Sequence, residues 1–239
     1  MILAINTATM QFGLAMLDEN GGLISELMIK PRGKNFRRFM PSIHSLFELS
    51  NISPREIKAI VIVKGPGSFT GLRVGLSAAK GMAQGLGIPI IGVSGLEVMA
   101  DQLSYSDYLI CPFIPSRREE VFLACFKKEK DDHLTRLMDD SCISFDDISK
   151  IIRSRTIFLG TDFHIQGALI KRSVGNNAIL APSYLWNLRA SSAGTLGYNR
   201  WLENDFDDLR ELVPAYMRPP DIRPNPYSLR DERDLSGKK

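Results

Sequence analysis

Apolar positions at the start of the chain fall into short runs separated by polar turns. Three such runs, Ile2–Ile5, Phe12–Leu17 and Leu23–Ile29, open the sequence, and Asp18–Gly22 supplies a glycine-containing turn between the second and third. Short apolar runs bounded by turn residues are typical of β-strands. The pattern therefore predicts an antiparallel meander at the N-terminus.

A helical pattern follows over Asn35–Ser50, and its apolar face is unusually wide. At about 100° per residue its apolar side chains cover about half of the circumference, whereas a helix on one sheet needs a narrower stripe. Either a second contact surface or full burial in a large core explains the extra width of this apolar face. Pro41 cannot complete the helical hydrogen bonding, so a kink or a helix start is expected near it. The residues of the wide face are Phe36, Phe39, Met40, Ile43, Leu46, Phe47 and Leu49.

The next segment alternates strands with helices. Ala59–Val63 predicts a buried strand, Gly65–Gly71 predicts a turn, and the residues that follow predict a helix up to about Leu86. A strand over Ile88–Val93 and a helix to about Leu103 come next. This order is expected of a sheet covered by helices, so the fold class is α/β.

The second half repeats the order of strands followed by helices. We therefore expect two lobes, 1–104 and 105–217, and then a mobile tail over 218–239, which is rich in proline and charge. The predicted elements of the second lobe are strands at Tyr108–Ile114, Glu120–Phe126 and Thr156–Leu159, and helices at Phe145–Ile152, Ile165–Arg172 and Ala190–Glu203.

The turn before the second helix is the most informative stretch. Free N–H groups and the helix dipole at a helix N-terminus favour an anion. Gly71 is followed by Leu72 and Arg73 rather than by Lys and Ser or Thr, so the turn is not a Walker A loop. Either a tight structural turn or an anion site for a phosphate or nucleotide fits the pattern. The residues of the anion-binding alternative are Gly65, Gly67, Ser68 and Thr70.

The helix after this turn carries small residues along one face, namely Gly71, Gly75, Ala78 and the larger Met82. Glycine inside a helix costs about 1 kcal/mol relative to alanine. Two glycines four residues apart therefore predict close approach of another helix. That neighbour is either the helix over residues 35–50 or a helix of a partner protein.

Composition places the chain among ordinary globular proteins. It has 239 residues, of which 44% are hydrophobic and 24% charged, and its net charge is +3. This balance lacks the strong basic excess of a dedicated nucleic-acid binder. The densest basic run, Lys30–Arg38, is either a solvated loop or a patch for phosphates or an acidic partner.

Cysteine usage and the N-terminus predict a cytoplasmic protein. Cys111, Cys125 and Cys142 form an odd set without metal-ligand spacing, which favours free thiols in a reducing compartment. No run of apolar residues is long enough to span a membrane, and the first residues lack a basic flank and a cleavage site.

Residue patterns for catalysis are missing from the sequence. His44, His133 and His164 lack the spacing of a helical metal site, and no nucleophile elbow is present. Asn6 ends the first strand, where nucleotide-binding folds commonly place an acid that directs magnesium or phosphate. An amide has no charge with which to hold Mg²⁺ in the usual carboxylate manner.

Several of these segments together resemble the bacterial TsaB (YeaZ) family. The resemblance rests on Ile2–Thr9, on Gly65–Gly75 with Ala79-Lys80-Gly81, and on Gly92–Leu96. Glu120-Val121-Phe122 and Val213–Arg218 match later landmarks of the family. The match is specific over about the first hundred residues and scattered beyond them.

The resemblance implies a fold, a role and a set of partners. The fold is that of two RNase-H-like lobes of the actin-like/Hsp70-like (ASKHA) superfamily. The role is that of a non-catalytic scaffold in the formation of threonylcarbamoyladenosine beside the anticodon of ANN-decoding tRNAs. The partners are a TsaD-type catalytic paralogue, which carries the metal-binding histidines, and a TsaE-type ATPase. No cofactor or metal is expected on this chain, and tRNA is reached through the complex.

The family also implies where the partner binds. Its members pair with TsaD through the first two helices of the N-terminal lobe, and alone they often form a homodimer through the same surface. This expectation agrees with the wide apolar face and with the small-residue face described above. The predicted interface residues are Phe36, Phe39, Met40, Ile43, Phe47, Gly71, Gly75, Ala78 and Met82.

The chain departs from the family pattern at four places. Asn6 replaces the usual Asp, and Asn35 lies where a His is common. Pro115-Ser116-Arg117 replaces Asp-Ala-Arg, and Gly160-Thr161-Asp162 replaces a Gly-Asp-Gly turn. The first and last changes argue against nucleotide hydrolysis and are compatible with the scaffold role or with a divergent paralogue. The alternatives are an ATP-dependent phosphotransferase of the same fold and a glycoprotease-like peptidase.

Overall fold

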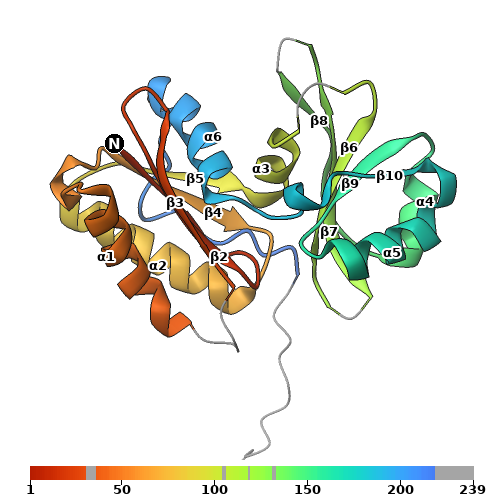
Figure 1. Ribbon diagram of the computed structural model, residues 1–239, viewed down its shortest axis with the longest axis horizontal. Coiled ribbons are helices and arrows are strands. Elements are labelled where there is room, and N and C mark those ends of the chain that lie inside the picture. Colours follow the sequence, from red (N-terminus) through yellow and green to blue (C-terminus); the bar gives the residue numbers. More distant parts are fainter. Residues whose placement is uncertain (31–35, 104–105, 118, 131–132, 219–239) are drawn as a thin grey trace, which may run out of the picture.

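The computed structural model describes residues 1–30, 36–103, 106–117, 119–130 and 133–218, and it contains two lobes (Figure 1). Each lobe is built on a five-stranded sheet, in the order β3-β2-β1-β4-β5 in the first and β10-β9-β6-β7-β8 in the second. The strands are β1 (Ile2–Asn6), β2 (Phe12–Leu17), β3 (Leu23–Ile29), β4 (Ala59–Gly65), β5 (Ile90–Ser94), β6 (Leu109–Pro115), β7 (Glu120–Lys128), β8 (Leu134–Ser144), β9 (Thr156–Leu159) and β10 (Ala178–Leu180).

The two sheets share one topology. In the first sheet β1, β2 and β3 are antiparallel neighbours, while β4 pairs parallel with β1 and β5 pairs parallel with β4. In the second sheet β6, β7 and β8 repeat the antiparallel part, and β9 and β10 repeat the parallel part. The expected α/β fold of two RNase-H-like lobes is therefore confirmed.

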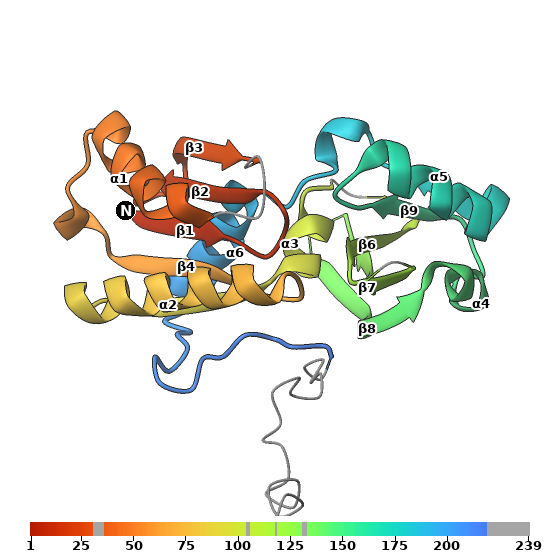
Figure 2. The same ribbon diagram turned by 90° about the horizontal axis from the view of Figure 1, so that it is seen from below.

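Two helices cover the outer face of each sheet (Figure 2). Over the first sheet, α1 contributes the buried side chains of Phe39, Ile43 and Leu46 to a core shared with α2 and the strands. None of the described helices has the length and apolarity needed to cross a membrane. The helices are α1 (Phe39–Ser50), α2 (Phe69–Leu86), α3 (Gly95–Asp101), α4 (Ile148–Ile151), α5 (Phe163–Val174) and α6 (Ala190–Leu202).

The two lobes exchange their third helices. Helix α3, which follows the first sheet, packs on β6 and β7 of the second sheet, and α6, which follows the second sheet, packs on β1 and β2 of the first (Figure 1). Small residues permit the close packing of α6, because a Cβ on Gly194 or Gly197 would lie within 2.3 Å of Leu17 or Val61. One apolar core therefore runs through both lobes.

This exchange differs from the expected division of the chain. The sequence assigns residues 105–217 to the second lobe, yet α6 lies within that range and packs on the first sheet. The assignment follows chain order, whereas the packing follows the apolar face of the helix. The expected tail over 218–239 lies outside the described residues, apart from Arg218.

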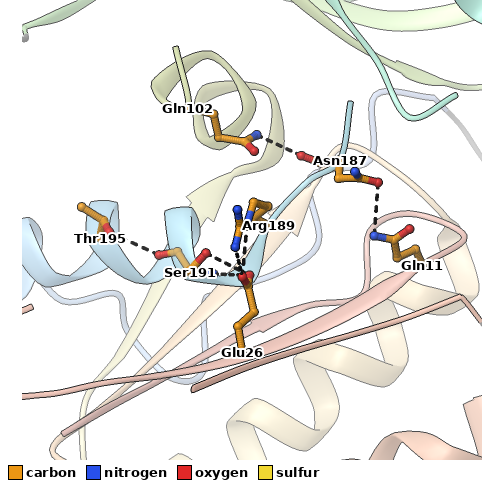
Figure 3. Close-up of polar contacts among 7 residues, drawn as sticks. All are labelled: Gln11, Glu26, Gln102, Asn187, Arg189, Ser191 and Thr195. Atoms are coloured by element: carbon orange, nitrogen blue, oxygen red, sulfur yellow. Dashed lines mark hydrogen bonds and ion pairs between the residues drawn. The ribbon is translucent and has the colours of Figure 1, made fainter. Parts of the chain in front are cut away.

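A half-buried carboxylate fixes the start of α6 on the first sheet (Figure 3). Glu26 of β3 accepts hydrogen bonds from the backbone N–H and the hydroxyl of Ser191, both at 2.9 Å, and it pairs with Arg189. Burial raises the pKa of the Glu26 carboxyl, but the hydrogen bonds from Arg189 and Ser191 outweigh it and hold the pKa below its ordinary value.

The chain segment that leads into α6 is also tied to the first lobe and to α3. Asn187 accepts a hydrogen bond from the Gln11 amide through its side chain at 3.2 Å, and its backbone carbonyl accepts one from the Gln102 amide at 2.9 Å (Figure 3). The crossing between the lobes is therefore held on both sides.

Some element boundaries differ from those expected. Strands β8 and β10 have no counterpart in the sequence prediction, because β8 contains Asp139 and Asp140 and is half-exposed along most of its length, and β10 is very short. Helix α1 begins at Phe39, which confirms a helix start near Pro41. Pro41 lies in the first turn, where its missing N–H costs nothing. Asn35 lies outside the described residues.

The glycines of α2 that were expected to face another helix face a loop instead. A Cβ on Gly71 would lie 2.1 Å from the backbone oxygen of Thr7, and a Cβ on Gly75 would lie 2.0 Å from the Thr7 hydroxyl. The prediction of a neighbouring helix at these two positions was wrong, because the turn after β1 fills that space. Gly81 is different, since a Cβ there would meet no other atom within 4 Å.

The two kinds of glycine in α2 predict opposite effects of one substitution. Gly71→Ala should destabilise the protein by about 1–3 kcal/mol, because the backbone of Thr7 cannot yield to the added methyl group. Gly81→Ala should stabilise it by about 0.5–1 kcal/mol through helix propensity alone. Urea denaturation of both variants measures the difference. Equal effects at the two positions would contradict the packing described here.

The Glu26 network predicts a pH-dependent loss of stability. Glu26→Gln should lower the free energy of unfolding at pH 7 by about 1.5–3 kcal/mol, because charge-assisted hydrogen bonds to Arg189 and Ser191 are weakened. The folded-state pKa is lowered, so the stabilisation is present above the unfolded-state pKa and is lost as the pH falls through the folded-state pKa. Urea titrations should show the gap from wild type closing below the ordinary value of 4.5.

A matched control separates this network from general charge effects. Glu19 is an exposed carboxylate in the turn between β2 and β3. Glu19→Gln should leave the free energy of unfolding within about 0.5 kcal/mol of wild type at every pH. A gap for Glu26→Gln that stays constant down to pH 3 would show that the carboxylate charge has no part in holding α6.

Candidate functional site

A cleft of about 610 Å³ opens between the two lobes. Its size is that of a small-molecule site, and its wall is mixed, with apolar side chains next to hydroxyl and guanidinium groups. Both lobes contribute through the turns that follow their strands, and the end of the described chain forms one wall. The lining residues are Ala8, Thr9, Met10, Gly67, Ser68, Phe69, Ile114, Pro115, Ser116, Arg117, Phe122, Thr161, Ala215, Tyr216, Met217 and Arg218.

The glycine turn before α2 is closed by contacts within the chain. The Ser68 hydroxyl caps α2 by accepting a hydrogen bond from the Gly71 N–H at 3.2 Å. The Ser68 N–H donates to the backbone oxygen of Ala8 at 2.7 Å, and a Cβ on Gly67 would lie 2.1 Å from the same oxygen. The carbonyl of Ala8 thus occupies a position where an anion would otherwise meet this turn.

Only part of the predicted anion site faces the cleft. Gly67 and Ser68 line it, whereas Gly65 and Thr70 do not. A Cβ on Gly65 would lie 2.9 Å from the backbone oxygen of Ala215, so this glycine permits the approach of the C-terminal segment. The structural alternative, a tight turn with glycines required by packing, therefore accounts for both Gly65 and Gly67.

Asn6 has a structural role at the end of β1. Its side chain is fully buried, its amide nitrogen donates to the backbone oxygen of Leu188 at 2.7 Å, and its amide oxygen accepts from the Ala8 N–H at 2.9 Å. The amide therefore joins the first strand to the segment that crosses between the lobes. An ionised aspartate at this position could not donate to Leu188.

The corresponding turn of the second lobe is filled by a side chain. Gln166 is buried, and its amide oxygen accepts hydrogen bonds from the backbone N–H groups of Thr161 at 2.8 Å and Asp162 at 3.1 Å. Asp162 also caps α5 through the Ile165 N–H at 3.0 Å. These N–H groups are thus satisfied within the chain. The sequence prediction did not include Gln166, and only its position one turn into the helix hints at this role.

The predicted partner interface divides into buried and exposed residues. Four of these residues are buried in the chain's own fold, namely Phe39, Ile43, Gly71 and Gly75. They can contribute to an interface only by packing under the residues that contact the partner. Met40 is 53% exposed, which leaves it available to a partner. The other predicted interface residues are half-buried and pack against the core of the first lobe, namely Phe36 before α1, Phe47 on α1, and Ala78 and Met82 on α2.

Metal-ligating and thiol groups form no site among the described residues. No group of three or more His, Cys, Asp or Glu side chains there could hold a metal ion. Cys111, Cys125 and Cys142 are free thiols. Cys111 and Cys125 face each other with sulfur atoms 3.6 Å apart, and burial raises the pKa of the Cys111 thiol well above its ordinary value.

Comparison with known sequences places the chain in one family. The family described as TsaD, tRNA N6-adenosine threonylcarbamoyltransferase, matches residues 19–218. The tRNA threonylcarbamoyladenosine biosynthesis protein TsaB of Bacillus subtilis is 32% identical over 220 residues, which cover 91% of this chain and 93% of that protein. A tRNA N6-adenosine threonylcarbamoyltransferase of Solidesulfovibrio magneticus is 40% identical over 77 residues, which cover 32% of this chain and 20% of that protein.

Comparison with solved structures supports the fold. YeaZ from Pseudomonas aeruginosa superposes with a TM-score of 0.73 at 21% identity, covering 90% of this chain and 98% of that one. The expected resemblance is confirmed by this fold and by the near-complete match to the Bacillus protein. The chain belongs to the TsaD-related family and, within it, to the TsaB (YeaZ) proteins.

Proposed function

We propose that this chain is a non-catalytic subunit of the machinery that forms N6-threonylcarbamoyladenosine next to the anticodon of tRNAs. In this proposal it binds and activates a TsaD-type catalytic paralogue, and a TsaE-type ATPase completes the complex. The tRNA is held by the complex rather than by this subunit alone. In the absence of the paralogue, the same surface joins two copies of this chain.

The observation that carries the proposal is the exposed apolar flank of α1 beside α2. Met40 is 53% exposed, and Phe47 of α1 and Met82 of α2 are half-buried. Met40 and Phe47 share a flank because they are seven residues, or about two helical turns, apart. An apolar flank of this kind suits packing against a partner's helices.

Two glycines on the exposed side of α2 add independent support. A Cβ on Gly81 or Gly85 would meet no other atom of the described chain within 4 Å. Each glycine costs a helix interior about 1 kcal/mol, and no contact within the lobe requires it. Close approach of a partner helix would use both positions.

The cleft supports a non-catalytic role. In a phosphotransferase of this fold, the turns that Ala8 and Gln166 close would be expected to hold phosphate groups. Here the Ser68 N–H donates a hydrogen bond to the Ala8 carbonyl, and the Thr161 N–H donates one to the Gln166 side chain. The side-chain amide of Asn6 donates to the Leu188 carbonyl and accepts from the Ala8 N–H. Nothing in the described residues favours the peptidase alternative, which also needs an activated nucleophile or a metal site.

The interface proposal predicts the loss of pairing from one buried charge. Met40→Asp should abolish co-purification with the TsaD-type paralogue of the same organism, because the interface would have to bury an unpaired carboxylate. Leu49→Asp is the matched control, since Leu49 is 75% exposed but lies on the opposite flank of α1, nine residues from Met40. It should leave pairing intact. Retention of pairing by Met40→Asp would exclude this surface.

The mass of the purified protein tests the shared surface. Light scattering should give a dimer for the wild type alone and a complex with the paralogue after mixing. Met40→Asp should be monomeric under both conditions, and Leu49→Asp should behave as the wild type. A Met40→Asp variant that still dimerises but no longer binds the paralogue would show that the two interfaces differ.

The position of Asn6 predicts that restoring an acid costs stability. Asn6→Asp should lower the free energy of unfolding by about 2 kcal/mol or more, because a buried carboxylate would face the Leu188 carbonyl without a proton to share. Asn20→Asp, in an exposed turn, should change it by less than about 0.5 kcal/mol. A stable Asn6→Asp variant that binds ATP and Mg²⁺ at micromolar concentration would favour the phosphotransferase alternative.

A further inference from the structure

The last described residues of the chain run past α2 of the first lobe toward the second lobe (Figure 2). We call residues 214–218 the C-terminal segment, and it begins beside β4. The Ala215 N–H donates to the backbone oxygen of Lys64 at 2.7 Å, and the carbonyl of Ala215 packs against Gly65. Four residues of the segment, Ala215–Arg218, form one wall of the interlobe cleft.

A side-chain stack anchors the segment to the first lobe. The Tyr216 ring lies 5.1 Å from the Phe69 ring, centroid to centroid, and the Arg73 guanidinium lies 3.8 Å above the Phe69 ring. Arg73 also donates a hydrogen bond from Nε to the Tyr216 hydroxyl at 2.8 Å. Phe69 and Arg73 are one turn apart on α2, and Phe69 and Tyr216 are 46% and 42% exposed, so the anchor lies at the surface of the first lobe.

An ion pair joins the segment to the second lobe. Arg218 contacts both carboxylate oxygens of Glu120, at the start of β7, with N–O distances of 2.6 and 3.3 Å. Both side chains are 35% exposed, although the Arg218 Nη1 atom that meets Glu120 is itself buried. The segment thus makes a backbone hydrogen bond, a ring contact and a side-chain hydrogen bond on the first lobe, and an ion pair on the second.

We infer that residues 214–218 form a latch on the interlobe cleft, hinged at Tyr216 on the first lobe and closed by Arg218 on Glu120 of the second. When the ion pair opens, Met217 and Arg218 move away from the cleft, while Ala215 and Tyr216 stay in place. The latch therefore sets access to the cleft, whatever enters it. This inference does not depend on the proposed role in tRNA modification.

A natural cysteine lies beneath the closing contact. The Cys142 sulfur lies 3.8 Å from the same Glu120 oxygen that contacts Arg218, and it is half-buried. Cys111 and Cys125 are buried, with exposed fractions of 0% and 5%. With the latch closed, Arg218 holds Glu120 over Cys142. The labelling rate of Cys142 therefore reports on the latch in the full chain without an added probe.

The latch predicts that a substitution at either of two positions in the segment exposes one thiol. Arg218→Ala should raise the rate at which iodoacetamide labels Cys142 by about fivefold, the population change expected when a half-exposed ion pair is lost. Tyr216→Ala should raise it by a similar factor, although Tyr216 does not touch Cys142 or Glu120. The double variant should be no faster than the faster single variant. Peptide mass spectrometry assigns the label to Cys142.

Hydrogen exchange separates the hinge from the closing contact. The Ala215 amide should exchange faster in Tyr216→Ala, which removes the anchor, but at the wild-type rate in Arg218→Ala. Raising the salt concentration should speed labelling of Cys142 in the wild type and not in Arg218→Ala. Arg210→Ala, an exposed arginine in the same terminal region, is the control and should leave both readouts unchanged.

Two results would overturn the inference. Unchanged labelling of Cys142 in Arg218→Ala would show that the ion pair does not hold the segment closed. Faster labelling in Arg218→Ala with wild-type labelling in Tyr216→Ala would show that Arg218 acts only on its immediate neighbours and that the segment is no latch. Circular dichroism of each variant establishes that the fold is retained before either rate is compared.

Discussion

The exchange of α3 and α6 between the lobes is the constraint on which the rest of the structure depends. Each helix buries its apolar side against the sheet of the other lobe, so one core runs through both lobes. Separating the lobes would expose this core to water, at a cost proportional to the apolar area uncovered. Glu26 then fixes the exchanged helix α6 by bonding its first turn.

The same exchange determines what the interlobe cleft can do. Because α6 is reached through residues 186–189, the amide of Asn6 is used to hold Leu188 in that crossing. The turn at Gly67 packs on Ala8, and the turn at Thr161 is filled by Gln166. Groups that would be free to meet an anion in an open cleft are therefore committed to the fold. What remains adjustable is the C-terminal wall.

The glycines of α2 have two different roles. Gly71 and Gly75 lie against Thr7, where any larger residue would collide with the turn after β1. Gly81 and Gly85 face open space on the outer side, where the isolated lobe has no need of them. The first pair belongs to the folding of the chain, and the second pair, with the exposed Met40, is the part that a partner would explain.

The sequence alone determined the two-lobed α/β fold, the family and most strands and helices, because these follow from local periodicity and contiguous motifs. It missed β8, whose half-exposed edge position blurs the apolar pattern. Only the tertiary structure decided that α6 packs on the first sheet, that Gly71 faces Thr7, and that Asn6 bonds Leu188, 182 residues away. Such contacts join positions far apart in the chain, and no local pattern records which distant residue fills a given space.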